Sequence, residues 1–228
     1  MNRRARLIAL LILAALGPSC LKSSTTPSTP TAPPPTLLFG EGWNDLVLPG
    51  TALSQWTAPV VSGGALAVID TLPADGNPSP SLSVTTSAYP GSYSTTAIPS
   101  VALTAPTLTL SANLAASRFN TGIATFRIDG AGGALARADW DASIGGITFT
   151  LGGASLGPFG PFATGVYHDV ELVIDASGTA RWLLDGSSTG LSAAWPAGMV
   201  TVTLLATFGG GAGTPPELRF DNILVTTP

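Results

Sequence analysis

The chain has 228 residues, of which only 10% are charged, with 27 glycines, 20 prolines, one cysteine and one histidine. Without residues 1–19 it carries six basic and thirteen acidic residues, a net charge of −7. That charge would repel a phosphate backbone, which excludes nucleic acid as a partner. One cysteine and one histidine are too few for the usual zinc ligand sets.

Residues 1–19 have the pattern of an export signal. Arg3, Arg4 and Arg6 precede an apolar run from Leu7 to Leu16, and small residues follow up to the cysteine. A bilayer-spanning helix needs about 20 apolar residues, so this shorter run predicts a cleaved signal peptide rather than a permanent transmembrane helix.

Cys20 follows the signal and cannot form an internal disulfide. The segment resembles the processing site of bacterial lipoproteins, with Ser19 before the cysteine, although Gly17 and Pro18 depart from the family pattern. The resemblance implies a lipid on Cys20. Because Leu21 follows rather than aspartate, it also implies the outer membrane or cell surface. The alternative is ordinary secretion near Ser19, which gives a soluble secreted or periplasmic protein.

Residues 20–36 are rich in Ser, Thr and Pro, a composition that cannot form a core. We expect a disordered linker. The sixteen residues from Leu21 to Thr36 would reach about 50 Å in an extended polyproline conformation, which would hold a domain clear of the lipid headgroups.

Residues 37–228 predict one all-β domain. Short runs of Val, Ile, Leu, Thr and Phe are separated by Gly, Pro, Asn and Asp, which is typical of an antiparallel sandwich or barrel. The runs cover residues 106–114, 122–130, 134–141, 146–153, 166–186, 200–208 and 217–225.

The clearest run, residues 166–186, predicts a hairpin turned by DASG. Side chains alternate with period two along a strand. The face expected to point inward carries His168, Val170, Leu172 and Ile174, then Ala180, Trp182 and Leu184. Asp169 and Glu171 fall on the other face. We interpret His168 as a residue at the edge of the core rather than as a catalytic base.

The order of these pieces resembles the concanavalin A-like, or laminin-G-like, jelly-roll superfamily. The similar segments are LFGEGWNDLVLPGTALSQW, TLTLSANL, YHDVELVIDASGTARWLLDG and LRFDNILV. The resemblance implies two antiparallel sheets packed face to face, one of them concave.

Catalytic and metal-binding motifs are not found in the sequence. Jelly-roll glycosidases carry Glu-x-Asp-x-(x)-Glu on one strand; here the nearest clusters are Asp169-Val-Glu171, followed by Asp175, and Asp139-Trp-Asp141. No calcium-loop spacing is present. We therefore predict no enzyme activity and no cofactor, with Ca²⁺ unsupported by any motif.

Aromatic residues leave binding as the remaining chemistry. Tyr89, Tyr93 and Trp140 are candidates for stacking on a sugar, whereas Phe159 and Phe162 suit packing over the end of the sandwich. The sequence predicts a surface-displayed lipoprotein module that binds a glycan or another envelope or extracellular partner. The alternatives are a structural envelope lipoprotein without a small ligand and a divergent jelly-roll carbohydrate-active enzyme.

Overall fold

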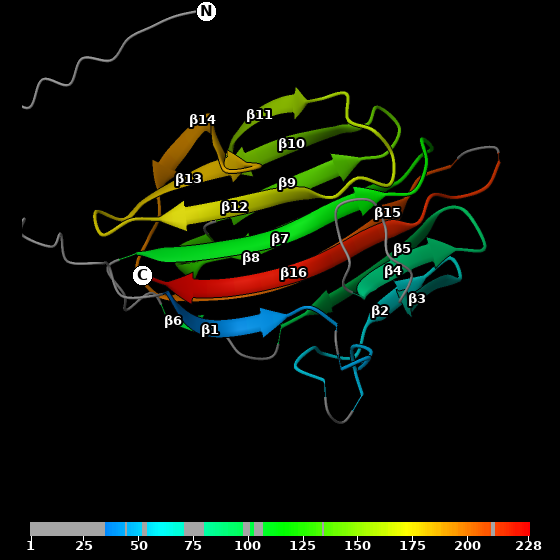
Figure 1. Ribbon diagram of the computed structural model, residues 1–228, viewed down its shortest axis with the longest axis horizontal. Coiled ribbons are helices and arrows are strands. Elements are labelled where there is room, and N and C mark those ends of the chain that lie inside the picture. The colour runs from blue at the N-terminus through cyan, green and yellow to red at the C-terminus, as the bar shows by residue number, and fades with distance from the viewer. Residues whose placement is uncertain are drawn as a thin grey trace, which may run out of the picture. The chain divides into compact units, whose positions relative to one another are not determined.

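The structure is a computed structural model that describes residues 35–43, 45–51, 54–70, 80–97, 101–102, 107–133, 135–210 and 213–228. The predicted signal peptide, Cys20 and most of the predicted linker lie outside the described residues. In the described ranges no helix is long and apolar enough to cross a membrane. Two antiparallel sheets pack face to face (Figure 1), which confirms the predicted all-β sandwich of the jelly-roll type.

The first sheet contains, in spatial order, β14 (Ser187–Ala194), β13 (Thr179–Leu184), β12 (His168–Ile174), β7 (Leu108–Ala116), β16 (Leu218–Thr227), β4 (Ser81–Thr86) and β3 (Ala65–Asp70). β1 (Thr36–Glu41) pairs with the second half of β16, while β4 pairs with its first half. Every pairing is antiparallel, as hairpins and Greek-key connections allow.

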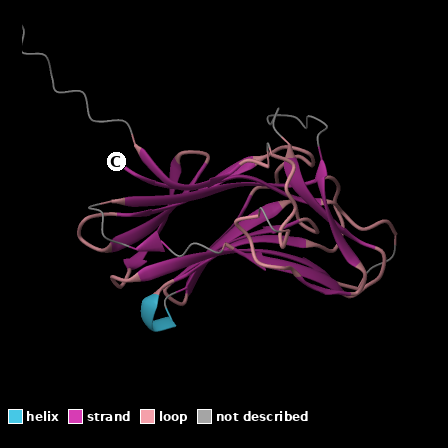
Figure 2. Cartoon of the chain, turned by 90° about the horizontal axis from the view of Figure 1, so that it is seen from below, coloured by secondary structure: helices cyan, strands magenta, loops and turns pink. Residues whose placement is uncertain are grey.

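The second sheet contains β11 (Ala154–Phe159), β10 (Gly146–Leu151), β9 (Leu135–Asp141), β8 (Ile123–Asp129), β15 (Met199–Phe208), β5 (Gly91–Thr96) and β2 (Val60–Ser62). β6 (Val101–Ala102) pairs with the start of β15. Figure 2 shows the two layers of strands and one short 3-10 turn, η1 (Ala131–Gly133), between β8 and β9.

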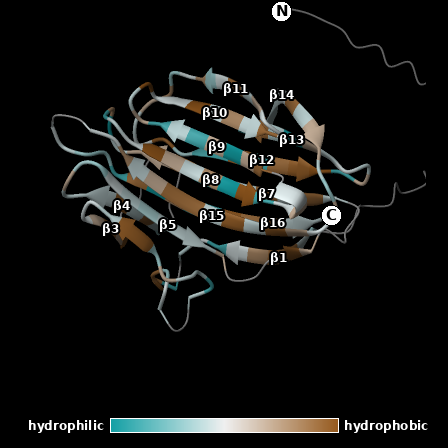
Figure 3. Ribbon diagram, turned by 180° about the vertical axis from the view of Figure 1, so that it is seen from behind, coloured by the Kyte–Doolittle hydropathy of each residue, from teal (hydrophilic) through white to brown (hydrophobic). Residues whose placement is uncertain are grey.

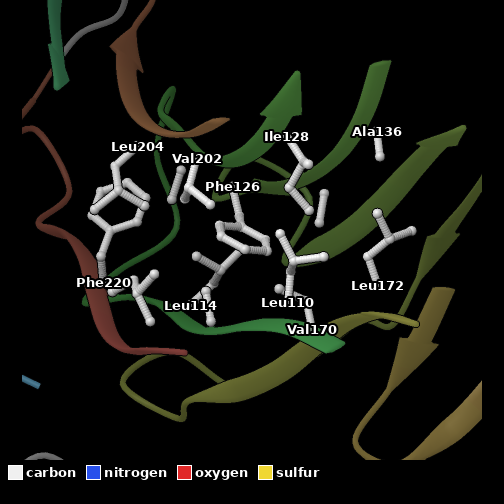
Figure 4. Close-up of a cluster of buried hydrophobic side chains, with 14 of the residues drawn as sticks. Leu110, Leu114, Phe126, Ile128, Ala136, Val170, Leu172, Val202, Leu204 and Phe220 are labelled. Atoms are coloured by element: carbon white, nitrogen blue, oxygen red, sulfur yellow. The ribbon is translucent and has the colours of Figure 1, made fainter. Parts of the chain in front are cut away.

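The core fills the space between the two sheets. Alternate residues of each central strand point inward, so that Leu110 and Leu114 of β7 meet Phe126 and Ile128 of β8 (Figure 4). In Figure 3 hydrophobic segments, coloured brown, lie along β15 and other strands in the middle of the sheets. All described members of the core cluster lie between Phe39 and Val225, so residues 35–228 have a hydrophobic core of their own.

The predicted hairpin is present as β12 and β13. Leu172 pairs with Trp182, and Trp182 is fully buried, as the alternation predicted. Asp175 Oδ1 accepts hydrogen bonds from the backbone N–H groups of Ser177 (2.9 Å) and Thr179 (3.1 Å), while Gly178 adopts φ 78°. The role of Asp175 is therefore to shape the turn.

Candidate functional site

Trp140 is not an exposed stacking platform, which corrects the sequence-based hypothesis. It lies on β9 with none of its surface exposed. Its ring stacks against Phe162 (5.6 Å between centroids) and His168 (5.2 Å). The alternation along β9 does place Trp140 opposite Asp139 and Asp141, but the indole is on the inner face.

Tyr89 and Tyr93 are also unsuited to stacking. Tyr93 lies on β5, faces the core and is 2% exposed, and burial raises the pKa of its hydroxyl. Tyr89 is partly buried against the core cluster. The last three residues of the YPGSY segment belong to β5, and period two turns Tyr93 inward.

His168 lies at the edge of the core, as predicted. The residue is 9% exposed, and its ring packs on Phe162 (4.0 Å between centroids) and Trp140. Nδ1 is 2.9 Å from Asp185 Oδ2, and the other oxygen of Asp185 accepts the backbone N–H of Asp169 (2.9 Å). Asp185 adopts φ 49°, so the carboxylate holds both His168 and its own strained turn in place.

Asp169 and Glu171 lie side by side on the outer face of β12. Burial, followed by the charge of Glu171, raises the pKa of Asp169 to about 7. Asn113 of the neighbouring β7 donates to Asp169 Oδ1 (3.4 Å) and accepts from Asn222 of β16 (2.7 Å). Across the part of the chain that the structure describes, no three His, Cys, Asp or Glu side chains are arranged to hold a metal ion.

A cleft of about 470 Å³ opens at one end of the outer face of the second sheet. Five strands or their ends contribute to it: β2, β5, β15, β8 and β9. Its lining comprises Ser62, Pro90, Gly91, Ser92, Thr121, Gly122, Ile123, Asp141, Ser143, Thr207, Phe208 and Gly209. Five of the twelve lining residues carry a hydroxyl group, Asp141 is the one carboxylate, and the rest of the lining is largely apolar.

Asp141 is a hydrogen-bond acceptor at the cleft. Its Oδ1 accepts from the backbone N–H (2.8 Å) and the hydroxyl (2.6 Å) of Ser143. Among the described residues, no group donates a hydrogen bond to Oδ2. On the opposite wall the hydroxyls of Ser62 and Ser92 lie 2.8 Å apart. The cleft therefore presents a carboxylate and several hydroxyls to anything that enters it.

Asp139 stands next to the cleft on the same face of β9. Its Oδ1 accepts from Thr125 Oγ1 (2.6 Å), and its Oδ2 is 2.6 Å from Arg137 Nε. Burial raises the pKa of Asp139, and the Asp141 charge raises it further, against the opposing effects of Thr125 and Arg137. Asp139 and Asp141 thus form a pair of carboxyl groups at alternate positions of one strand.

Phe119 is an exposed aromatic ring over the turn that contributes Ser143 to the cleft, and it is absent from the residues predicted from the sequence. It is 57% exposed and lies over Gly145, whose added Cβ would come within 2.5 Å of the ring. Gly145 belongs to the same turn as Ser143. Asn120 anchors the loop through its side-chain amide, which donates to Thr214 O (2.8 Å). The signal was available in the sequence, because SRFN places one aromatic residue among polar ones between two strands.

No protein-family model matches the chain, and no curated protein matches its sequence. The solved structures that share the fold include the following three. The Emp47p carbohydrate recognition domain has a TM-score of 0.58 and 10% identity, covering 82% of this chain and 94% of that one. A glycosyl hydrolase family protein from Mycobacterium fortuitum has a TM-score of 0.56 and 13% identity, covering 83% and 99%. A sialidase has a TM-score of 0.53 and 14% identity, covering 77% of this chain but only 17% of its own.

These neighbours are jelly-roll sandwiches that include a lectin-like domain and enzymes. At such identities the likeness shows the fold alone. It nevertheless contradicts the prediction that the chain is not an enzyme, because chains named as a sialidase and a glycosyl hydrolase share this sandwich. The absence of one glycosidase motif does not exclude other arrangements of catalytic residues on the same fold.

Proposed function

We propose that the protein is a glycan-binding module that a lipid on Cys20 displays at the bacterial cell surface. The observation that carries the glycan assignment is the cleft of about 470 Å³, which combines apolar surface with five hydroxyl-bearing residues and Asp141. Phe119 is exposed over the turn that contributes Ser143. The carbohydrate recognition domain among the structural neighbours supports the same class of ligand.

The chemistry of a sugar fits both parts of this site. A sugar ring presents hydroxyl groups at its rim and C–H groups on its faces. Asp141 Oδ2 would accept hydrogen bonds from hydroxyls, and charge-assisted bonds of this kind are stronger than neutral ones. Phe119 would stack on a C–H face, and its two rotatable bonds make immobilisation inexpensive. The cleft is open, so we expect weak affinity, with a Kd of about 1 μM to 1 mM.

A glycan array followed by titration calorimetry tests this function. We expect binding of a glycan by residues 35–228 that falls about tenfold or more in Asp141→Asn, because this variant keeps the shape and loses the charge. Phe119→Ala should weaken the same interaction. The matched control is Ile144→Ala, which removes an exposed apolar side chain from the same turn. Glycan binding that is unchanged in Asp141→Asn and in Phe119→Ala would place the glycan elsewhere on the domain.

A second candidate function is a divergent carbohydrate-active enzyme. The specific observation is the pair Asp139 and Asp141 beside the cleft, where the pKa of Asp139 is raised. A carboxyl group with a raised pKa suits general acid catalysis. Release of sugar from a polysaccharide by the wild type, lost in both Asp139→Asn and Asp141→Asn, would favour this candidate over a binding module.

A further inference from the structure

One edge of the sandwich exposes an unusual amount of aliphatic surface. At this edge β3 ends the first sheet and β2 ends the second. Figure 1 shows β2 and β3 toward one end of the lower margin of the domain and β1 toward the other end. Seven of the twelve exposed large apolar side chains in the described ranges lie here. These seven, the apolar edge, are Leu37, Leu38, Leu46, Val60, Val61, Leu66 and Val68. Such concentration marks an interaction surface.

Part of the apolar edge surrounds a shallow apolar groove of about 160 Å³. The groove is lined by Leu48, Pro49, Pro59, Val61, Ala65, Leu66, Ala67 and Tyr93. It therefore runs from the loop before β2 to the edge strands β2 and β3. Gly63 turns the chain from β2 to β3 with φ 61°, and a Cβ there would collide with the Pro90 carbonyl oxygen. The groove is therefore built on a tightly packed turn.

Leu46 is presented to solvent from a strained but well-anchored turn. It is 54% exposed and adopts φ 58°, a region that costs energy for a side chain of this kind. Its N–H donates to the Trp43 carbonyl (3.0 Å). Trp43 is fully buried, donates from Nε1 to Phe220 O (3.0 Å) and stacks on Trp56. The fold thus holds an exposed leucine outward.

The charge around the apolar edge is low and negative. Residues 35–70 contain no Lys, Arg or His. Glu41 is 8% exposed, and Asp70 pairs with Arg219 at 2.8 Å. Asp45 is exposed in the same turn as Leu46. Contact at this edge must therefore come from apolar burial and not from attraction to an anionic surface.

We propose that the apolar edge docks on a lipid bilayer. The chain enters the sandwich at Thr36, directly beside Leu37 and Leu38. An attachment upstream through a linker that reaches about 50 Å when extended would let the domain either stand clear of the headgroups or approach them, and it would raise the effective concentration of this edge at the membrane. The seven side chains come from a turn, β1 and the edge strands of different sheets. These side chains do not lie along one strand, so they do not form a regular strip that a second copy of the chain could match. The acyl and headgroup layer of a bilayer adapts to such an uneven surface.

Flotation with phosphatidylcholine vesicles tests this docking. The protein used is the domain of residues 35–228, which contains the whole described core. We expect the wild type to partition onto the vesicles, and Leu46→Ser, Val60→Ser and Leu66→Ser each to lower the partition coefficient about tenfold. Ile144→Ser is the matched control, since Ile144 is 50% exposed but lies outside the edge. Circular dichroism of each variant checks that the sandwich is intact.

Three results would overturn the proposal: no partition of the wild type, an equal loss in Ile144→Ser, or a lipid-free dimer that the same edge substitutions dissociate while vesicle binding is absent. The last would make the edge an interface between two copies. Asp141→Asn should leave vesicle partition unchanged, and the edge variants should retain glycan binding, so the docking and the proposed glycan site fail or succeed separately.

Discussion

The indole Nε1 of Trp182 donates a hydrogen bond of 3.0 Å to the carbonyl oxygen of Thr150. Trp182 belongs to β13 of the first sheet and Thr150 to β10 of the second, so this bond joins the two layers of the sandwich. The ring also packs against Phe126 and Phe149 of the second sheet. The largest side chain of the hairpin therefore contributes both packing and a buried polar contact between the sheets.

Trp182→Ala should lower the free energy of unfolding by about 3 to 5 kcal/mol, because it leaves a cavity between the sheets. Trp182→Phe should cost less, since it keeps much of the volume but leaves the Thr150 carbonyl without its donor. Urea denaturation measures both variants. Equal stabilities of Trp182→Ala and the wild type would contradict the burial of this ring.

Trp140 and Phe119 should behave in opposite ways. Trp140→Ala removes a fully buried ring stacked on His168 and should cost about 3 to 5 kcal/mol of stability. Phe119→Ala removes an exposed ring and should change stability by only about 0.5 kcal/mol, while it weakens glycan binding. Thermal melts and calorimetry on the same samples separate the two effects. A Phe119→Ala variant that unfolds as easily as Trp140→Ala would assign Phe119 to packing.

The pKa of Asp169, raised to about 7 by burial and then by Glu171 and Asp185, predicts a pH-dependent stability. Because the folded pKa lies above the ordinary value of 3.8, the folded state binds this proton more tightly than the unfolded state. The contribution of protonated Asp169 to the free energy of unfolding is therefore complete below about pH 4 and is lost as the pH rises through about 7.

Asp169→Asn should flatten the fall in stability between about pH 4 and pH 7, and it should be more stable than the wild type at the upper end. Urea titrations at several pH values measure this. Asp129→Asn is the control with the same change of charge, on an exposed residue paired with Arg127. An unchanged slope in Asp169→Asn, or an equal change in the control, would be inconsistent with the raised pKa.

Cys20→Ala should abolish labelling with fatty acid and move most of the protein from the membrane fraction to the soluble fraction. If the apolar edge docks on lipid, a small membrane-bound remainder should persist and should disappear when Leu46→Ser and Leu66→Ser are added. Metabolic labelling and fractionation in a bacterial host measure both quantities. Persistent labelling of Cys20→Ala would remove the lipoprotein assignment.

Local pattern was sufficient for much of the fold. Period two along residues 166–186 put Leu172 and Trp182 on one face, and Gly178 marked the turn between them, because side-chain direction and turn geometry depend on neighbours in the chain. The same alternation separated Trp140 from Asp139 and Asp141. Which of those two faces is buried depends on the sheet that packs against β9, and the alternation alone does not carry that information.

The cleft required the tertiary structure. Ser62, Ser92, Asp141 and Thr207 are far apart in the chain and meet only because β2, β5, β15, β8 and β9 lie in one sheet in that order. The sequence marks Phe119 as an aromatic residue among polar ones, and the tertiary structure places it over the turn that holds Ser143. The apolar edge was equally hidden, since an aliphatic run such as ALAVI reads as a buried strand until strand order makes it the last in its sheet. Composition and alternation follow from the chain alone, whereas strand order and sheet packing decide which surfaces water, lipid or a ligand can reach.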